Sequence, residues 1–310
     1  MTQYSILNKQ DVKRILIPYS IKNLTNVEKL SGGYENTNYL ITANNHHYVL
    51  SLFERKSPDH VKILEQLLSH LNKNNFKSSQ TISTTNGQAV TYWNKKPIII
   101  KHFIEGTVMD TLPNHIIKLV GEATGKLHQV PAPDYLPKTI DYGQENFKLV
   151  NQYAPKTTFE NWIQAVKRYI QPYLEMDLPK AFIHSDLFCS NIIISSDEKS
   201  VIIMDFEEAA YYYRIFDIGM AIIGLCSEGK ILNKEKVKSF LIGYKKEIKL
   251  TPDEEKALQA FTVYAGASMT FWRHRNFNYV YPNIGLKNRF KALQRLTDYA
   301  KAQSSLFFKC

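Results

Sequence analysis

The sequence predicts an α+β fold with two lobes, a small β-rich lobe over residues 1–100 and a larger, mainly helical lobe over residues 101–310. Short apolar runs bounded by turn residues dominate the first hundred residues. Beyond residue 106 the apolar residues recur at helical spacing. One β-hairpin pattern, at residues 192–204, interrupts the helical half, so the second lobe is expected to hold a hairpin among its helices.

Length and composition are those of a globular protein that can bury one large or two modest cores. The chain has 310 residues, of which 44% are hydrophobic and 22% charged. Its longest apolar run, near residues 218–226, is shorter than the ~20 residues that span a bilayer, and no signal peptide is visible. Three cysteines without paired or metal-ligand spacing favour a reducing compartment, so a cytoplasmic location is expected.

The charge balance is basic, with 39 Lys and Arg against 29 Asp and Glu and a net charge of +10. The basic residues are scattered along the sequence and no nucleic-acid-binding module is recognised, so neither nucleic acid nor a membrane is expected as a partner. An anionic nucleotide and a small-molecule substrate explain the charge well enough. The sequence leaves the oligomeric state open.

The first lobe is expected to contain one amphipathic helix within residues 1–19 and a second helix at residues 59–72. Its expected strands are short apolar runs at residues 27–31, 39–42, 48–53, 89–93 and 97–104. The segment of residues 98–106 should cross between the lobes, and the backbone near Lys101 and Phe103 would then face an adenine. An ordinary strand without a ligand is the equal alternative there.

A glycine pair lies between the first two expected strands. Gly32 and Gly33 are followed by Asn36 and Asn38. Adjacent glycines let the backbone approach a ligand closely, so N–H groups in this turn could face phosphates. By itself the pair is a weak signal, because a simple hairpin turn is the commoner meaning of Gly-Gly, but its position one strand before the apolar run at residues 48–53 adds weight to a nucleotide-binding turn.

The second lobe shows helical periodicity over most of its length. The expected helices lie at residues 114–129, 161–173, 234–246, 253–275 and 287–302. Three consecutive tyrosines, residues 211–213, are interpreted as a loop that packs under this lobe.

The chemistry is expected in residues 182–209. His184 and Asp186 open this segment, Asn191 follows in the same loop, and two apolar strands lead to Asp205. A hairpin brings its ends together, so Asn191 and Asp205 should lie close in space. Phosphoryl transfer needs an oriented hydroxyl and hard oxygen ligands for Mg²⁺. The spacing therefore predicts a kinase site, with Asp186 as base or orienter, Asn191 and Asp205 as metal ligands, and His184 as a brace for the loop. A hairpin capped by polar turn residues is the alternative.

These motifs resemble the aminoglycoside phosphotransferase/choline kinase superfamily, which has a bilobal, protein-kinase-like fold. The match rests on Leu127-His128, the loop from His184 to Asn191, Asp205-Phe206 and Asp217-Ile218-Gly219. The resemblance implies a nucleotide-binding first lobe, a catalytic second lobe, and ATP and Mg²⁺ as cofactors. The activation segment and Ala-Pro-Glu box of protein kinases are missing, which argues against a protein substrate.

A narrower resemblance is to the bacterial, type II homoserine kinases. It is carried by residues 33–39 with 48–54, by the His-x-Asp-Leu-Phe-x-x-Asn form of the catalytic loop, and by Phe-Trp-x-x-Arg at residues 271–275. It implies ATP-dependent phosphorylation of the side-chain hydroxyl of L-homoserine, a step of threonine biosynthesis. The alternatives are a kinase for another amino alcohol, an aminoglycoside or a sugar, or a non-catalytic nucleotide-binding relative.

Several residues bear on the choice of acceptor. An amino acid presents a carboxylate, for which Arg275 and, second, Arg273 are candidate partners, since an Arg binds a carboxylate with two hydrogen bonds. A solvated basic helix end is the alternative for both. Glu207 follows Asp205-Phe206 where the homoserine kinases carry aromatic or small residues, and it could recognise an amine. Ser51 stands where many kinases have a strand lysine, and Cys189 occupies a position that the loop motif leaves free.

Overall fold

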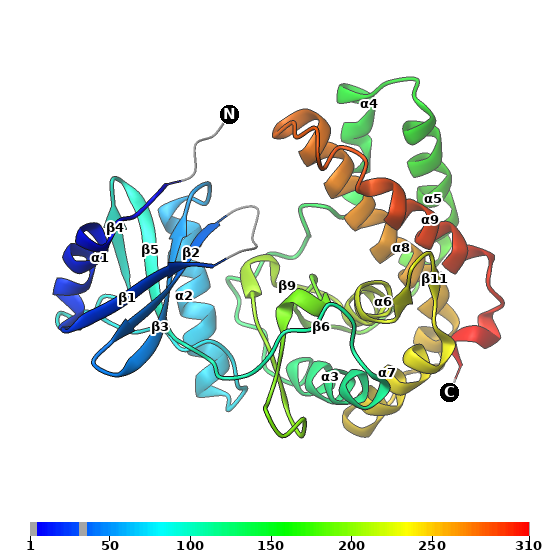
Figure 1. The fold of residues 1–310 in the computed structure, drawn as a ribbon. Coiled ribbons are helices and arrows are strands. Elements are labelled where there is room, and N and C mark those ends of the chain that lie inside the picture. The colour runs from blue at the N-terminus through cyan, green and yellow to red at the C-terminus, as the bar shows by residue number, and fades with distance from the viewer. Residues whose placement is uncertain (1–4, 31–35, 310) are drawn as a thin grey trace. The chain divides into compact units, whose positions relative to one another are not determined.

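The computed structural model describes residues 5–30 and 36–309. The chain forms two compact units, here called unit 1 (Met1–Glu105) and unit 2 (Gly106–Cys310), and Figure 1 shows the elements of each along the chain. The glycine pair Gly32 and Gly33 lies outside the described residues.

Unit 1 is built on an antiparallel sheet with the strand order β1-β2-β3-β5-β4. The strands are β1 (Leu24–Lys29), β2 (Asn36–Ala43), β3 (His46–Phe53), β4 (Val90–Trp93) and β5 (Lys96–His102). Burial alternates along β2 because successive side chains of a strand point to opposite faces. One face carries Tyr39, Ile41, Leu50 and Leu52, which form the core of this unit.

Two helices accompany the sheet. The first, α1 (Lys9–Leu16), begins at a capping box of Asn8 and Asp11 and packs its buried residues into that core. It is shorter than the helix expected within residues 1–19, because a 3₁₀ turn with a proline, η1 (Ile17–Tyr19), replaces its last turn. The second, α2 (Pro58–Lys73), begins with a proline after the Ser57 cap and buries an apolar stripe, as the periodicity predicts.

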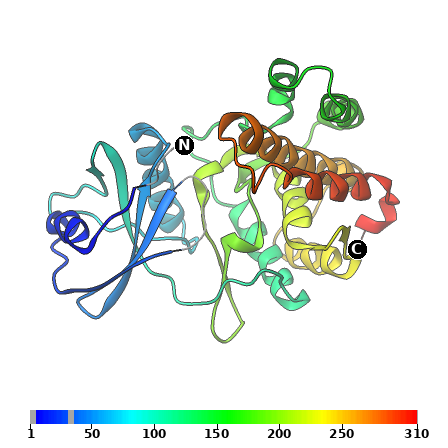
Figure 2. The ribbon, with the colours of Figure 1, turned by 45° about the horizontal axis from the view of Figure 1, so that its top comes forward.

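Unit 2 is mainly helical. Its helices are α3 (Asn114–Leu127), α4 (Val150–Tyr153), α5 (Thr158–Leu174), α6 (Arg214–Leu225), α7 (Lys234–Glu247), α8 (Pro252–Arg275) and α9 (Phe290–Ala302). The long α8 packs against α5, α6 and α9, and both ribbon views show α9, in red, running along it (Figures 1 and 2). A second contact joins α3 to α7, where Gly121 and Gly243 leave no room for a Cβ against the opposing backbone.

Helix α8 has strong signals at both ends. Thr251 and Glu254 form a capping box around Pro252, and acids occupy the first turn while Arg273, His274 and Arg275 occupy the last. This arrangement opposes the helix dipole at each end. A π-helical turn, η5 (Asn276–Val280), follows directly. The basic residues 273–275 therefore lie at a well-defined helix end, between the last turn of α8 and η5.

Short strand pairs complete unit 2. They are β6 (Lys180–Ile183) with β9 (Ala210–Tyr213), β7 (Ile192–Ile194) with β8 (Val201–Ile203), and β10 (Ser227–Glu228) with β11 (Ile231–Leu232). The interpretation of residues 211–213 as a loop is wrong, because these tyrosines form β9 and alternate between exposed Tyr211 and buried Tyr212. Antiparallel pairing with β6, about thirty residues earlier in the chain, makes this segment a strand.

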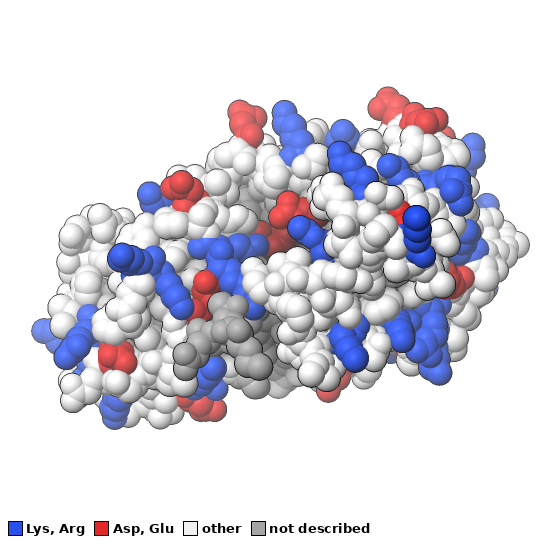
Figure 3. All heavy atoms as spheres, turned by 90° about the horizontal axis from the view of Figure 1, so that it is seen from above, with Lys and Arg blue, Asp and Glu red and all other residues white. Residues whose placement is uncertain are grey.

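The surface carries dispersed charge. On the face shown in Figure 3, Lys and Arg side chains are scattered and interspersed with acids rather than gathered into one stripe. Within residues 5–30 and 36–309, no helix combines the length and apolarity needed to cross a bilayer.

Candidate active site

The expected hairpin lies in unit 2 and brings two polar loops to one end. Ile192 of β7 pairs with Ile203 of β8, and beyond this pair the Met204 N–H donates to the Asn191 carbonyl at 2.8 Å. Asn191 therefore lies opposite Met204, one residue before Asp205. The loop after β6 and the loop after β8 meet at this point, as the hairpin spacing predicts.

Asp186 lies half-buried in the loop after β6 and is held by Asn191. The Asn191 side-chain amide donates to the Asp186 backbone carbonyl at 2.8 Å and to Asp186 Oδ2 at 3.1 Å. Because both donors of the amide are used in this way, the amide oxygen of Asn191 is turned away from Asp186. The arrangement gives Asp186 one defined orientation and makes the Asn191 Oδ1 atom an acceptor for a ligand.

The electrostatic environment of Asp186 is unusual. The pKa of this carboxyl is raised to about 7, first by burial and then by the negative charges of Asp205 and Glu208, against the Asn191 hydrogen bond and the charge of Arg273. The negative charges of Asp205 and Glu208 thus both act on the Asp186 carboxylate, and the charge of Arg273 opposes them in part. A divalent cation would relieve this repulsion, and it would also restore the charged form of Asp186.

Asp205 is exposed and has left-handed backbone dihedrals, with φ +66°. This conformation is uncommon outside glycine, although Asp tolerates it better than most residues. The next residue, Phe206, begins the short 3₁₀ turn η4 (Phe206–Glu208) and is buried against the rings of Phe182 and His184. The buried ring anchors the turn, and the strained backbone directs the Asp205 carboxylate outward.

His184 uses both of its ring nitrogens within the protein. Nε2 donates to the Met204 carbonyl at 2.7 Å, and Nδ1 accepts from the Asp186 N–H at 3.2 Å. The side chain has no exposed surface. A buried ring with both nitrogens engaged is suited to hold the two loops together rather than to transfer protons, as the sequence interpretation expects.

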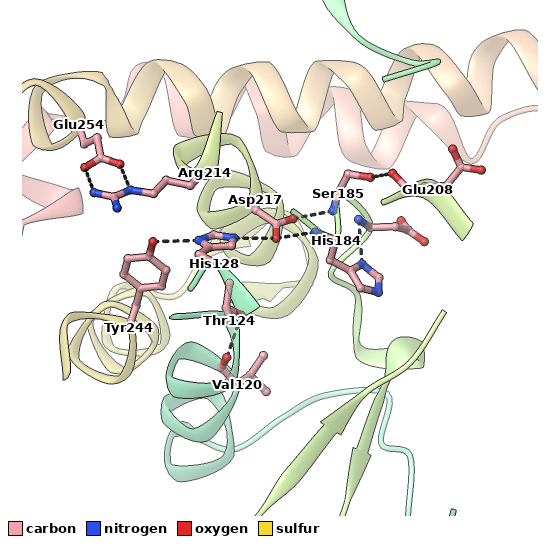
Figure 4. A network of polar contacts seen from close by, with 11 residues as sticks. Val120, Thr124, His128, His184, Ser185, Glu208, Arg214, Asp217, Tyr244 and Glu254 are labelled. Atoms are coloured by element: carbon pink, nitrogen blue, oxygen red, sulfur yellow. Dashed lines mark hydrogen bonds and ion pairs between the residues drawn. The ribbon is translucent and has the colours of Figure 1, made fainter. Parts of the chain in front are cut away.

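Asp217 on α6 anchors the same loop from behind (Figure 4). Its fully buried carboxylate accepts from the backbone N–H groups of His184 at 2.9 Å and Ser185 at 2.7 Å. It also accepts from His128 Nε2 at 3.1 Å, and His128 Nδ1 lies 2.9 Å from the Tyr244 hydroxyl. The sequence marked Asp217 and His128 as motif residues without a role. The available signal for Asp217 was its place as an acid inside an apolar helical run, because a buried carboxylate needs hydrogen-bond donors.

The loop also packs tightly on the end of α6. A Cβ added to Gly224 would collide with the Leu187 carbonyl and approach the Phe188 backbone. Beside it, the Cys189 thiol points to the Gly224 carbonyl at 3.7 Å, and burial raises the pKa of that thiol. Cys189 therefore has the features of a packing residue, because a raised pKa disfavours the reactive thiolate.

One of the acceptor candidates, Arg273, borders the Asp186 loop. The Arg273 guanidinium lies over the Phe188 ring, 5.7 Å from its centroid, and its charge acts on Asp186. Arg275 instead acts on Tyr153, opposing the rise in pKa that burial causes there. Glu207 lies in η4, two residues after Asp205. The structure thus places Arg273 beside the Asp186 loop and Arg275 near Tyr153.

The nucleotide-binding candidates lie in unit 1. Asn36 and Asn38 lie on β2, where Asn38 is opposite Ser51 of β3, and Lys101 lies on β5. Phe103 follows β5 and its N–H donates to the His47 carbonyl at 3.2 Å. Ser51 is buried and its hydroxyl has no hydrogen-bond partner among the described residues. A role for these residues in nucleotide binding stays a prediction.

The described residues contain no cluster of three His, Cys, Asp or Glu side chains that could by itself hold a metal ion. Proteins usually bind Mg²⁺ through one or two carboxylates together with water and substrate phosphates. The Asp205 carboxylate and the Asn191 amide oxygen, which also accepts from the Ser190 hydroxyl at 3.4 Å, would form such a partial ligand set, and the negative charge around Asp186 favours a cation there.

The antiparallel sheet of unit 1 and the helical unit 2 with its polar hairpin define a protein-kinase-like phosphotransferase. The sequence profile of the phosphotransferase enzyme family matches residues 26–246. The chain belongs to this family.

Similar proteins agree with that assignment. The homoserine kinase of Methylobacillus flagellatus is 26% identical over 290 residues, 92% of this chain and 90% of the relative. That of Zymomonas mobilis is 27% identical over 294 residues, 90% of each chain. The solved structure of a microcompartment-associated aminopropanol kinase has a TM-score of 0.75 at 14% identity, covering 97% of this chain and 99% of its own. The expected bilobal kinase-like fold is confirmed.

Proposed function

We propose that this protein is an ATP-dependent kinase that phosphorylates the side-chain hydroxyl of L-homoserine. Full-length similarity to homoserine kinases supports the acceptor, and family membership supports the reaction. The observation that carries the proposal is the joining of Asp186, Asn191 and the Asp205 turn at one end of the β7-β8 hairpin.

Each residue of this group then has a role. Asp186 accepts a hydrogen bond from the acceptor hydroxyl, orients it for in-line attack and takes up its proton, while the new O–P bond to the γ-phosphorus forms and the bond from that phosphorus to the departing ADP breaks. Asn191 and Asp205 would hold Mg²⁺, which supplies charge neutralisation for the ATP phosphates. His184 keeps the two loops in register. Gly32, Gly33, Asn36, Asn38, Lys101 and Phe103 are proposed for the nucleotide.

The acceptor is proposed to be recognised by its two opposite charges. Homoserine is a zwitterion at neutral pH, so a matching site needs a cation for its carboxylate and an anion for its ammonium group. Arg273 beside Phe188 supplies the first, and the acids of η4, Glu207 or Glu208, supply the second. Arg275 is the weaker candidate for the carboxylate, because its charge acts on Tyr153 instead.

The proposal is tested by ATP turnover with Mg²⁺ on L-homoserine, L-serine, L-threonine, 1-amino-2-propanol, choline and kanamycin. Preference for homoserine is expected. Arg273→Ala should raise KM for homoserine about 10- to 100-fold, because a charged hydrogen-bonded pair contributes about 1.5–3 kcal/mol. Arg275→Ala, two residues along the same helix, is the matched control with a smaller expected change. If the protein turns over other acceptors of this panel but not homoserine, the proposed substrate is refuted.

A second candidate is a kinase for an amino alcohol without a carboxylate. The two acids of η4 favour it, since they suit an ammonium group, and the aminopropanol kinase shares the fold. In that case 1-amino-2-propanol should exceed homoserine in kcat/KM, and Arg273→Ala should leave its turnover unchanged.

A further inference from the structure

Ser185, between His184 and Asp186, has a backbone conformation that a serine rarely adopts. Its φ is +68°, in the left-handed region, which costs a residue other than glycine roughly 1–2 kcal/mol. Glycine would adopt the same backbone without that cost. The side chain therefore has to contribute something that offsets the strain.

The Ser185 hydroxyl is buried and fully hydrogen-bonded. It donates to the Glu208 carbonyl at 2.6 Å and lies 2.8 Å from the hydroxyl of Tyr142. A serine has one hydroxyl proton, which goes to Glu208, so Tyr142 is the donor to Ser185. The Tyr142 hydroxyl also reaches the Ser185 carbonyl at 3.2 Å. Burial, followed by the nearby carboxylates, keeps the pKa of Tyr142 well above its ordinary value, so it remains a donor.

These bonds join the Asp186 loop to the last residue of the turn that follows Asp205. Glu208 is the last residue of η4, the turn that Asp205 begins. At the other end, Met204 is already bonded to His184 and Asn191. The Ser185–Glu208 bond therefore closes a ring around Asp205, and Figure 4 shows Ser185 between Asp217 on one side and Glu208 on the other.

We propose that Ser185, supported by Tyr142, is a positioning residue that fixes the Asp205 turn against the Asp186 loop and thereby sets the affinity of the site for its divalent cation. This inference rests on the proposed function. It goes beyond that function by assigning metal affinity to a residue that touches neither metal nor substrate.

The test separates the hydrogen bond from the backbone strain. Ser185→Gly removes both the hydrogen bond and the strain, so their effects on stability offset each other and the melting temperature should change little. The KM for Mg²⁺ should rise about tenfold, which corresponds to the loss of one net hydrogen bond. The kcat at saturating Mg²⁺ should fall less than threefold. Ser185→Ala keeps the strain, so it should show the same Mg²⁺ effect with a lower melting temperature. Tyr142→Phe should raise the KM for Mg²⁺ less than either variant.

Two further measurements do not depend on turnover. Mn²⁺ binding in the presence of ADP, followed by electron paramagnetic resonance, should weaken about tenfold in Ser185→Gly. Backbone hydrogen exchange over residues 205–210 should accelerate. The matched control is Ser195→Ala in the same hairpin, because the Ser195 hydroxyl also lies within hydrogen-bond distance of a backbone carbonyl, that of Ser200 at 3.0 Å, besides the Asp197 carboxylate at 2.7 Å. It should leave the Mn²⁺ affinity unchanged.

Two results would overturn the inference. One is unchanged Mn²⁺ affinity and exchange in Ser185→Gly. The other is a loss of stability with parallel changes in kcat and KM, which would indicate a structural role alone. If the unaltered protein turns over none of the acceptors but binds Mn²⁺ with ADP, the proposed function fails, and the Mn²⁺ comparison still decides the role of Ser185.

Discussion

Two carboxylates, one in each unit, contrast in their surroundings. Glu54, after β3 in unit 1, has a side chain that is 2% exposed and accepts from the Ser5 N–H at 2.7 Å and from the Thr37 hydroxyl at 2.7 Å. Lys96 completes the group with an ion pair. Burial by itself would raise the pKa of Glu54, but the hydrogen bonds from Lys96, Thr37 and Ser5 hold it below its ordinary value.

Asp186 in unit 2 has the opposite balance. Its pKa is raised to about 7, because burial is followed by repulsion from Asp205 and Glu208, and one amide is its hydrogen-bond donor. A carboxylate whose charge is already matched stabilises the fold, whereas one surrounded by like charge retains its interaction energy for a ligand. Glu54 thus has the surroundings of a structural acid, and Asp186 has those expected of a functional one.

Asp186→Asn tests the functional side and has the largest expected effect. Turnover should fall roughly 10²–10⁴-fold, because the acceptor hydroxyl loses its proton acceptor. The melting temperature should stay the same or rise, since the change removes a repelled charge. Steady-state kinetics and thermal unfolding measure the two effects, with Asp197→Asn on the exposed hairpin turn as control. Turnover within twofold of the unaltered protein would refute the role of Asp186.

Gly224→Ala tests whether packing, as well as charge, positions Asp186. The added methyl group would meet the Leu187 carbonyl and push the loop away from α6. Turnover should fall about 10- to 100-fold, in line with the cost of a misplacement near 1 Å. Gly285→Ala is the control, because a Cβ there meets nothing closer than 3.4 Å. Equal kinetics for the two variants would show that the loop tolerates displacement.

Glu54→Gln tests the structural side of the comparison. Loss of the carboxylate charge leaves the Lys96 ammonium group without its ion-pair partner and weakens the hydrogen bonds from Ser5 and Thr37. The free energy of unfolding should therefore fall by about 1–3 kcal/mol. The folded variant should keep the turnover number of the unaltered protein. Chemical denaturation and kinetics at saturating substrates measure this. Glu28→Gln on the exposed side of β1 should be neutral. A large loss of kcat without loss of stability would contradict the contrast.

The pH dependence of stability should differ in sign between the two acids, and this is the smallest expected effect. The folded pKa of Asp186 is raised, so its stabilising contribution is present below its unfolded pKa and is lost as pH rises toward about 7. The folded pKa of Glu54 is lowered, so its contribution is present above its unfolded pKa and is lost as pH falls through the folded value.

Unfolding free energies without Mg²⁺ measure this difference. As the pH rises from 5 to 8, the unfolding free energy of Asp186→Asn should increase relative to that of the unaltered protein by on the order of 2 kcal/mol. The unfolding free energy of Glu54→Gln should approach that of the unaltered protein only when the pH falls below the ordinary pKa of a glutamate. Parallel pH profiles for the two variants would contradict the assignment of opposite pKa shifts.

The sequence anticipated much of the fold because its helices carry strong local signals. Helix α8 has a proline and a capping box at its start and basic residues at its end, so its limits follow from neighbouring residues. The strand β9 was mistaken for a loop because its partner β6 lies about thirty residues away. A short strand is stabilised mainly by that distant pairing, and its own residues carry little signal.

The sequence by itself determined which residues meet at the candidate site, since the spacing of His184, Asp186, Asn191 and Asp205 around two apolar strands specifies a hairpin that joins its ends. Only the tertiary structure decided which neighbours act on that hairpin. It put Asp217 behind the loop, tied Ser185 to Glu208, and placed Arg273 rather than Arg275 beside Phe188. These contacts join residues that are about 20 to 90 positions apart, and packing among helices and strands, rather than local spacing, brings them together.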